Sequence, residues 1–497
     1  MEARTIFRNI SPLDHRYSLS EQALFEALEP WISEDAAIGS CVKAEIALMT
    51  AHLTLRGALR PELKTALEQA GAEVSSAAVY AAEAKTKHHI RALVQVLKSK
   101  VPPETAALVH LGATSADILD TALSYRMQGV TREIILPRLR ELELLLCGFV
   151  EQEAASPQVG RTHGQHAVPI TLGFALAEYV SRLGKSILEI ERRVQDLKGK
   201  LAGAVGAYNA TTLITADPEA LERLYLQELG LEPSEHATQL VEPEYLLRLL
   251  LEFNVAFGII ANLADDIRNL QRSEIGELRE RFTQDQVGSS TMPQKRNPWN
   301  AEHVKSLWKA FMPRVTTFFM DQISEHQRDL TNSASQRFIA DYVFGFCLGV
   351  SRMTSIIQGL EPDHERLLSN LQDGGIPGGI MAEPAYLLLA ETGVSDAHEV
   401  IRRITLRAEQ ESCSFAQALS QEGPVLERIA GKLVELGLVA SPGEAQAFFE
   451  RPQAYCGLAV QKAKAIARKY RILTGGGKPL ESLESKQVRK EIQEKYV

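Results

Sequence analysis

Apolar residues recur every three or four positions through most of the middle of the chain, and this spacing places them on one face of an α-helix. The run 242–271 shows the pattern most clearly, with apolar side chains at Leu246, Leu249, Leu250, Phe253, Phe257, Ile260, Leu263, Ile267 and Leu270. Similar patterns predict helices over 134–154, 170–198 and 300–324. Alternating β-branched runs between tight turns, which indicate strands, are almost absent. The sequence therefore predicts an all-α protein.

These predicted helices are longer than the average of about 11–12 residues, and they need continuous burial along one stripe, so we expect a central bundle of long helices. Breaks rich in proline and glycine flank the bundle, at 101–112 and at 373–379. They predict an N-terminal helical domain over 1–112, a long-helix bundle over 113–362 and a C-terminal helical domain over 363–497. The tail 474–497 is rich in Lys and Glu, and we expect an exposed helix or partial disorder there.

Composition narrows the class of protein. A chain of 497 residues with 45% hydrophobic content can bury a large core without disulfides, and its five cysteines form no C-x-x-C pair, which favours a reducing cytoplasm. The start of the chain has no apolar signal core, and no stretch is expected to keep the ~18 uncharged apolar residues that a membrane span requires. The net charge of −9 disfavours nucleic-acid partners, so an anionic ligand would have to meet a local basic cluster.

The strongest local signal is the loop 288–298, G-S-S-T-M-P-Q-K-R-N-P, which precedes a predicted long helix. Backbone amides beside glycine and small hydroxyl side chains can cradle carboxylate oxygens, while Lys295 and Arg296 supply positive charge. A serine in this loop could also act in proton transfer. The alternative is an ordinary surface loop with basic residues.

A second polar stretch, 160–169, places His163 between a threonine and a glycine just before another predicted helix. Imidazole titrates near neutral pH, and a neighbouring hydroxyl or amide can fix its tautomer, so His163 is a candidate acid or base. Histidines of this kind are also commonly structural. In a third stretch, Thr114 or Ser115 can either cap a helix with Asp117 in its first turn or contact a ligand.

Segment 327–337 places Arg328 and Arg337 nine residues apart around hydroxyl and amide side chains. Arginine binds phosphate in a fork, and serine and threonine add neutral donors, so this composition suits a phosphate. A solvated helix end with salt bridges explains the segment equally well.

Lys87, His88 and His89 stand inside an alanine-rich helical pattern, where adjacent histidines face different ways and make a poor chelating pair. The sequence contains neither an H-E-x-x-H motif nor a cluster of Cys and His with ligand spacing, so we expect no metal. A G-x-G-x-x-G fingerprint after a strand is also missing, so we expect no dinucleotide and no other cofactor.

Taken together, these stretches resemble the fumarase/aspartase superfamily and, within it, the adenylosuccinate lyases, over most of the chain. The superfamily pattern G-S-S-x-M-P-x-K-x-N-P is reproduced without a gap at 288–298 and is highly specific. The R-T-H-G-Q sequence at 161–165 is typical of adenylosuccinate lyases, because argininosuccinate lyases and fumarases usually have leucine in place of Gly164. Similar stretches also lie at 11–17, 114–117, 203–209, 238–239 and 327–331, whereas the chain beyond Asp363 resembles the family only loosely.

The resemblance implies an anti β-elimination that releases fumarate from adenylosuccinate and from succinyl-aminoimidazole carboxamide ribotide in purine biosynthesis. Ser289 matches the family's general base and His163 its general acid. A serine base needs a strongly depressed pKa, and Lys295 with the loop amides could stabilise both its alkoxide and the aci-carboxylate intermediate.

The same matching implies a set of substrate contacts and an architecture. The implied contacts are Arg16, Tyr17, Arg328, Ser333 and Arg337 for the nucleotide, Thr114, Ser115 and Gln239 for the succinyl end, Lys87, His88 and His89 in the site, and Lys295, Asn297 and Glu302 in or beside the loop. In the family, three helical domains assemble into a homotetramer with a twenty-helix core, and each site draws residues from three subunits. The resemblance thus implies a cytoplasmic homotetramer with a small-molecule nucleotide substrate and no nucleic-acid or membrane partner.

Two positions depart from the family pattern. His89 stands where the family usually has aspartate, and His166 stands where it usually has proline. The second would bring another imidazole close to the acid and could shift the pKa of that acid. The alternatives are therefore a sister lyase, of the argininosuccinate lyase or cycloisomerase type, acting on another succinyl substrate, and a non-catalytic member of the fold.

Overall fold

The computed structural model describes residues 5–282, 290–372 and 377–475. Most of these residues are helical, which confirms the all-α prediction, and their strands form only small two-stranded sheets. The chain divides into two compact units, and unit 1 comprises Met1–Arg140, Lys185–Gly258 and Ser306–Ser351. Unit 2 comprises Glu141–Gly184, Ile259–Lys305 and Arg352–Val497. The predicted domain boundaries at 112 and 362 stay predictions.

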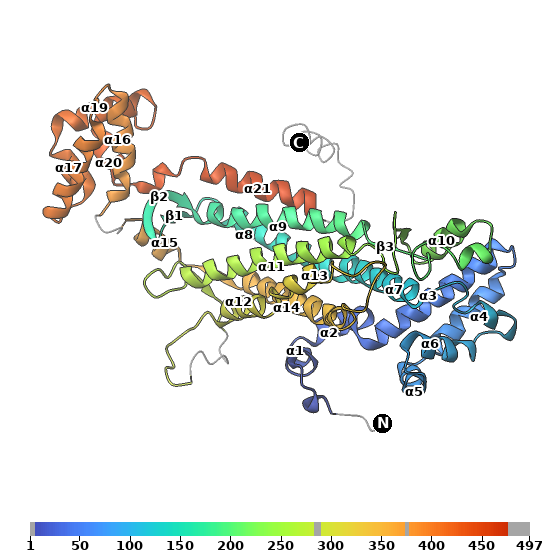
Figure 1. The fold of residues 1–497 in the computed structure, drawn as a ribbon. Helices are drawn as coiled ribbons and strands as arrows, with labels where there is room; N and C mark the ends of the chain where they lie inside the picture. Colours follow the sequence, from blue (N-terminus) through green and yellow to red (C-terminus); the bar gives the residue numbers. More distant parts are fainter. Residues whose placement is uncertain (1–4, 283–289, 373–376, 476–497) are drawn as a thin grey trace. The chain divides into compact units, whose positions relative to one another are not determined.

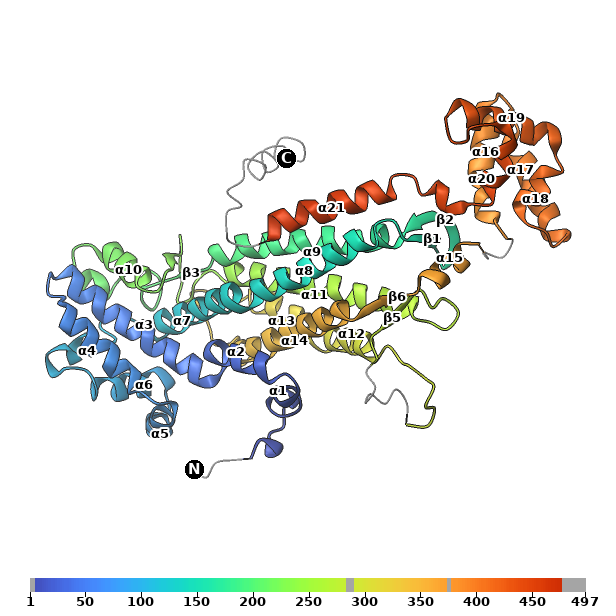
Figure 2. The ribbon, with the colours of Figure 1, turned by 180° about the vertical axis from the view of Figure 1, so that it is seen from behind.

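Unit 1 contains the N-terminal helices and two short segments of parallel strand. Its elements are α1 (Arg16–Ser20), α2 (Gln22–Ile32), α3 (Glu34–Leu55), α4 (Pro61–Ala72), α5 (Ser76–Thr86), α6 (His89–Lys98), α7 (Ser115–Val130), β3 (Lys198–Gly199), α10 (Pro218–Gln227), β4 (Glu232–Pro233) and α13 (Arg314–Met320). Helix α3 packs against α4, α7 and α10, and Figures 1 and 2 show these helices side by side.

Unit 2 contains two antiparallel strand pairs and the C-terminal helices. Its elements are β1 (Pro157–Thr162), β2 (Gln165–Thr171), β5 (Leu278–Glu280), β6 (Leu360–Pro362), α15 (His364–Gln372), α16 (Ala382–Glu391), α17 (Ala397–Gln410), α18 (Phe415–Ser420), α19 (Gly423–Glu435), α20 (Ala445–Phe449) and α21 (Ala459–Thr474). Helices α16 to α20 share one apolar core, and they form the orange cluster of Figure 1.

The long helices contribute residues to both units. They are α8 (Leu136–Gln152), α9 (Leu172–Gln195), α11 (Glu244–Leu270), α12 (Trp299–Phe311) and α14 (Ile339–Gln358). The predicted helices over 134–154, 170–198 and 242–271 are confirmed as α8, α9 and α11. The single helix predicted over 300–324 is wrong, because α12 ends at Phe311 and α13 begins at Arg314. Pro313 lies at this break, and it has no N–H to continue the helical hydrogen bonds.

Two helical stretches, Gln22–Leu55 and α11, are long and apolar enough to cross a membrane by length and composition alone. Neither stretch contains 18 consecutive uncharged residues, because Lys43 and Glu45 interrupt the first and Arg248 and Glu252 interrupt the second, so the expectation is not contradicted. In the apolar windows of these two stretches, 72% and 56% of the residues are buried inside the protein. Because the core helix of a folded domain passes the same test, the finding is weak evidence for a membrane span.

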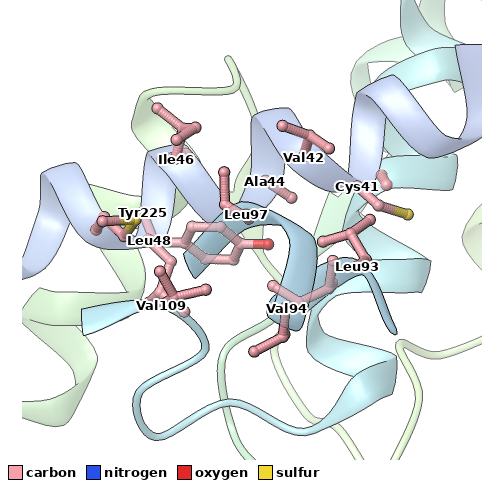
Figure 3. Packing of buried hydrophobic residues seen from close by; sticks show 14 of the residues in the cluster. Cys41, Val42, Ala44, Ile46, Leu48, Leu93, Val94, Leu97, Val109 and Tyr225 are labelled. Carbon is pink, nitrogen blue, oxygen red and sulfur yellow. The ribbon is translucent and has the colours of Figure 1, made fainter. Parts of the chain in front are cut away.

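The core of unit 1 is centred on α3, whose middle is buried on all sides. Figure 3 shows Tyr225 of α10 among aliphatic side chains of α3 and α6. The Tyr225 hydroxyl donates a hydrogen bond of 3.0 Å to the backbone oxygen of Asp117, so its polar end is satisfied where the ring is buried. Close approach of α2 and α7 needs glycine at 129, because a Cβ there would lie 1.9 Å from the Trp31 ring.

A buried ion pair ties the start of α7 to the segment after β3. The side chains of Asp117 and Lys200 are both fully buried and pair with each other. The Asp117 carboxylate also accepts hydrogen bonds from the backbone N–H groups of Thr114 at 2.8 Å and Ala202 at 3.2 Å. Thr114 is the N-cap residue of α7, so the capping interpretation is confirmed. Lys200 donates a further bond of 3.2 Å to the Gly203 carbonyl.

A cavity of about 70 Å³ in unit 1 is lined by apolar and polar side chains of α7, α11 and α13, of the segment before α11 and of the segment between α13 and α14. Asp120 of α7 lies in this lining and accepts a 3.0 Å hydrogen bond from the backbone N–H of Val241. Burial raises the pKa of Asp120 to about 6, although the Val241 bond and the charges of Lys200 and Arg328 oppose the shift. The cavity thus holds a carboxyl group that changes charge close to neutral pH.

We expect Lys200→Met to lower the free energy of unfolding by about 3–5 kcal/mol, because the Asp117 carboxylate would stay buried without its counter-charge. Urea unfolding followed by circular dichroism measures this change. Lys198→Met is the matched control, since Lys198 pairs with Glu232, whose side chain is 78% exposed, and we expect a loss below about 1 kcal/mol. Equal losses in the two variants would contradict the importance of the buried pair.

We expect Asp120→Asn to change how stability depends on pH. Folding raises the pKa of Asp120 from 3.8 to about 6, so the folded chain binds this proton more tightly than the unfolded chain. Stability is therefore lost as the pH rises from about 4 to about 6, and the loss is constant above that range. Asparagine cannot ionise and can still accept from Val241, so the variant should match the parent near pH 4 and exceed it at pH 8 by up to about 3 kcal/mol. Urea unfolding of both proteins at pH 4 and pH 8 checks this. A parent that is more stable than Asp120→Asn at pH 8 would refute it.

Candidate active site

The predicted acid, His163, lies at the tip of a β-hairpin. Strands β1 and β2 pair in antiparallel register up to Thr162 and Gln165, which leaves His163 and Gly164 as a two-residue turn. Both turn residues have positive φ, 55° for His163 and 72° for Gly164, as a type I′ turn requires. Glycine adopts this conformation freely, whereas a histidine there is uncommon. The turn leaves His163 exposed, on a hairpin that the helical sequence pattern did not predict.

Arg161, two residues before this turn, is anchored to a buried carboxylate. Its guanidinium donates to both oxygens of Glu277, at 2.5 Å and 3.0 Å, and Glu277 is fully buried. The same carboxylate accepts hydrogen bonds from the side-chain amides of Gln158 at 2.7 Å and Asn370 at 2.8 Å. The hairpin that carries His163 is thereby joined to α15 and to the residue that precedes β5.

His166 faces Arg161 across the two strands. Burial lowers the pKa of His166, the positive charge of Arg161 lowers it further, and the negative charge of Glu277 acts in the opposite direction. This departure from the family pattern therefore places an imidazole beside an arginine whose charge is already paired.

The predicted base, Ser289, lies outside the described residues, as does Gly288, the first residue of the same loop. The described part of the loop leaves Lys295 exposed and Asn297 half-buried, directly before α12. Glu280 caps this helix, because its carboxylate accepts from the backbone N–H groups of Asn300 at 3.3 Å and Ala301 at 2.8 Å. Burial raises the pKa of Glu280, and the two amide bonds oppose the shift.

In unit 1, three predicted substrate segments lie close together. Thr114 and Ser115 begin α7, the helix that carries Asp120 to the cavity described above. The backbone N–H of Gln239 donates a 3.1 Å hydrogen bond to the Gln327 carbonyl. The next residue, Arg328, lines the same cavity as Asp120.

Arg328 has a guanidinium that is only partly satisfied among the described residues. One terminal nitrogen donates a 3.4 Å hydrogen bond to the Asp321 carbonyl, while the buried Nε has no described hydrogen-bond partner. The backbone of Arg328 has a φ of 132°, which only glycine adopts readily. The guanidinium of Arg328 therefore lines the cavity with donor capacity that the described residues do not use.

The prediction that Lys87, His88 and His89 lie together inside one helical stretch is wrong, because α5 ends before Lys87 and α6 begins at His89. Lys87 is left-handed, with a φ of 55°, and ends α5, while His88 caps α6 by accepting a 3.2 Å hydrogen bond from the Arg91 N–H. The alanine-rich pattern runs through this junction because alanine favours helix on both sides of it. His89 Nδ1 lies 3.0 Å from a carboxylate oxygen of Glu83.

Tyr80 of α5 links two of the predicted residues that are far apart in the sequence. Its ring lies 6.5 Å from that of His89 in an edge-on arrangement. A 2.7 Å hydrogen bond to Glu34 is the main cause that raises the pKa of Tyr80 to about 12, and the positive charge of Arg337 lowers it. Tyr80, which the sequence interpretation did not include, thus contacts His89 and feels the charge of Arg337.

The predicted site residues thus divide between the two units. Unit 2 holds His163, Lys295 and Asn297. Unit 1 holds an exposed Arg16, a half-buried Tyr17 and the remaining residues, which are Lys87, His88, His89, Thr114, Ser115, Gln239, Arg328, Ser333 and Arg337.

Sequence reasoning also missed two buried charges that hold these segments, Glu277 and Lys200. The available signal was weak, since each stands among other charged residues, Glu274 and Arg279 beside Glu277 and Lys198 beside Lys200, and nothing in the sequence marks it out as the buried one. A charged residue of that kind is seldom buried unless it is paired, so its partner had to be known first.

Comparison with known proteins adds an independent line of evidence. A family model described as "Lyase" matches residues 16–310, and one described as "Adenylosuccinate lyase C-terminal" matches 324–439. The adenylosuccinate lyase of Pyrococcus horikoshii is 33% identical over 435 residues, which cover 86% of this chain and 93% of that protein. The adenylosuccinate lyase of Pyrococcus abyssi is 34% identical over 413 residues, 81% of this chain and 88% of that protein.

Solved structures share the fold. The 3-carboxy-cis,cis-muconate lactonizing enzyme of Pseudomonas putida superimposes with a TM-score of 0.76 at 25% identity, covering 91% of this chain and 99% of that one. The lyase model spans more than half of the chain, and relatives above 30% identity cover most of it. The chain therefore belongs to the adenylosuccinate lyase family of the fumarase/aspartase superfamily.

Proposed function

We propose that this chain is an enzyme that eliminates fumarate from adenylosuccinate, giving AMP, and from succinyl-aminoimidazole carboxamide ribotide in purine biosynthesis. One observation carries the proposal. This chain, a member of the family, has the whole loop sequence at 288–298 and also has His163 on an exposed turn that a buried ion pair anchors. Those are the groups that an elimination of this kind needs.

The proposed reaction removes a proton and then a nitrogen leaving group. Ser289 takes the proton from the carbon beside one succinyl carboxylate, and the electrons of that C–H bond move into the carboxylate to form a dianionic aci-acid. The electrons return to form the double bond of fumarate as the C–N bond breaks, and His163 protonates the departing nitrogen. Lys295 stabilises the dianion, because its ammonium stands exposed in the loop directly before α12.

The nucleotide half of the substrate is assigned to unit 1. Arg328, with its free Nε, and the exposed Arg337 and Ser333 supply donors for phosphate, and Arg16 and Tyr17 are assigned to the nucleotide by family matching. Thr114, Ser115 and Gln239 are assigned to the succinyl end. Lys87, His88 and His89 complete this set, and the His89 ring lies 6.5 Å from that of Tyr80.

We also propose a cytoplasmic homotetramer in which each site combines residues of several subunits. The family architecture supports this state. Light scattering of the purified chain measures the oligomeric state.

The two alternatives are less well supported. A sister lyase is not favoured, because both curated relatives described above are adenylosuccinate lyases and Gly164 agrees with them. A non-catalytic member of the fold is opposed by the presence of Ser289, His163 and Lys295 in the sequence.

We expect the purified chain to convert adenylosuccinate to AMP and fumarate, followed as a fall in ultraviolet absorbance. His163→Ala and Ser289→Ala should each lower kcat by about 10²–10⁴, because each removes a proton-transfer group. His398→Ala, an exposed histidine of α17, is the control and should leave kcat unchanged. A folded parent that is inactive on adenylosuccinate but active on a non-nucleotide succinyl compound would favour the sister lyases instead.

We expect Arg337→Ala to raise the KM for adenylosuccinate about 10- to 100-fold, the loss that corresponds to one charge-assisted hydrogen bond. The kcat should change little, because phosphate contacts are the same in the ground state and in the transition state. Arg403→Ala, whose side chain is 70% exposed on α17, serves as the control. An unchanged KM would show that Arg337 does not bind the phosphate.

A further inference from the structure

Strand β5 is short, but carboxylates at its two ends reach both proposed reactive segments. Glu277 directly precedes the strand, and Glu280 is its last residue. The strand is held in place by antiparallel pairing with β6, from Leu278 opposite Pro362 to Glu280 opposite Leu360. All of these residues, the hairpin and the described part of the loop belong to unit 2.

Glu277 is a rigid anchor for the hairpin. Its backbone N–H donates to the Leu270 carbonyl at 2.9 Å, and its own carbonyl accepts from Asp363 at 3.0 Å, so its position is set from both sides. Its buried carboxylate then receives Arg161 in a two-pronged pair as well as the amides of Gln158 and Asn370. A buried carboxylate with this many fixed donors has little freedom to move.

Arg161 transmits this rigidity to the turn. The regular pairing of β1 and β2 is interrupted between Val159 and Arg161, so the end of the hairpin is less firmly tied to its base by backbone bonds. Beyond this irregularity only the Arg161–His166 and Thr162–Gln165 pairs precede the turn. The Arg161 pair with Glu277 is therefore the buried side-chain contact that fixes the part of the hairpin carrying His163.

Glu280 acts on the other segment. Its carboxylate accepts from Asn300 through both the backbone N–H, at 3.3 Å, and the side-chain amide, at 2.9 Å, and from the Ala301 N–H at 2.8 Å. The backbone N–H of Glu280 donates a 2.9 Å hydrogen bond to the side-chain oxygen of Gln271. The side-chain amide nitrogen of Gln271 in turn donates a 3.4 Å hydrogen bond to the Arg296 carbonyl. A carboxylate at a helix N-terminus is also favoured by the helix dipole. The first turn of α12 and the end of the loop are thus tied to β5.

We propose that β5 sets the positions of the two reactive segments, with Glu277 positioning the His163 turn and Glu280 positioning the loop end that carries Lys295 and Asn297. Protein donors occupy both carboxylates, so we assign both as positioning residues and not as substrate contacts. This inference rests on the proposed function, because the effect is measured on the elimination of fumarate.

The main experiment compares Glu277→Gln and Glu280→Gln with a matched control, Glu361→Gln. Glu361 is exposed on β6, opposite Arg279 of β5, so the control removes a carboxylate from the same small sheet. Steady-state kinetics on adenylosuccinate are measured at a temperature where circular dichroism shows every variant fully folded. Glu277→Gln should lower kcat about 10- to 100-fold with KM within about threefold, because a displaced acid slows the chemical step without loosening binding.

Glu280→Gln should act differently, because the loop is proposed to bind the carboxylates of the substrate as well as to take part in the chemical step. We expect KM to rise by about tenfold and kcat to fall less than in Glu277→Gln. The control Glu361→Gln should match the parent in both parameters. Kinetic constants of Glu277→Gln and Glu280→Gln that match those of the control would overturn the proposal.

A double variant separates positioning from stability. Glu277→Gln leaves Arg161 buried with an unpaired charge, whereas Arg161→Met/Glu277→Gln removes that charge and should recover stability. If Glu277 acts by positioning, kcat of the double variant stays low, because the hairpin is still released. Recovery of kcat together with stability would show a merely structural role and overturn the proposal.

Hydrogen exchange supplies a readout that does not depend on activity. The backbone amides of 162–166 should exchange faster in Glu277→Gln than in Glu361→Gln, and equal rates would contradict the anchoring of the turn. An inactive parent would overturn the proposed function and this inference with it. An active parent with unaffected variants would overturn this inference alone.

Discussion

Burial of a carboxylate is expensive unless fixed donors surround it, and two carboxylates that meet this constraint hold segments carrying predicted site residues. In unit 1 the Asp117 carboxylate meets the Lys200 ammonium and the backbone amides of Thr114 and Ala202. In unit 2 the Glu277 carboxylate meets Arg161 and two side-chain amides. Each carboxylate joins segments that are distant in the sequence, so the demand for donors also fixes the loops that carry candidate chemistry.

A helical bundle alone would not produce this arrangement. Apolar stripes align the long helices, but they are insensitive to the conformation of the turns at the helix ends. Polar groups determine the conformation of these turns, since a hydrogen bond fixes both the distance and the direction between its donor and its acceptor. The caps at Thr114 and Glu280 therefore set where α7 and α12 begin, and with them the positions of Ser115 and Asn297. Stability comes mostly from the apolar core, and the geometry of the candidate site comes from a few buried charges.

The same division explains what the sequence could predict. The spacing from Leu249 to Ile267 predicted α11 correctly, because one apolar face repeats over many turns. The loop 288–298 and His163 were found because their residue types are unusual together and resemble a known family. The hairpin at 157–171 was missed, since its strands are short and carry polar residues. Glu277 and Lys200 were missed because burial of a charge depends on partners more than 70 residues away along the chain.

The turn at His163 shows how such support is used. A histidine with a φ of 55° is in a sparsely populated conformation, and a strained residue persists only where its surroundings determine it. Gly164 adds no strain to the turn, because glycine adopts positive φ without a steric penalty. The positive φ of His163 is instead maintained by the register of the hairpin, which the Arg161–Glu277 ion pair stabilises. The strain therefore falls on the residue that must project from the surface, and the buried ion pair supplies the rigidity that keeps it there.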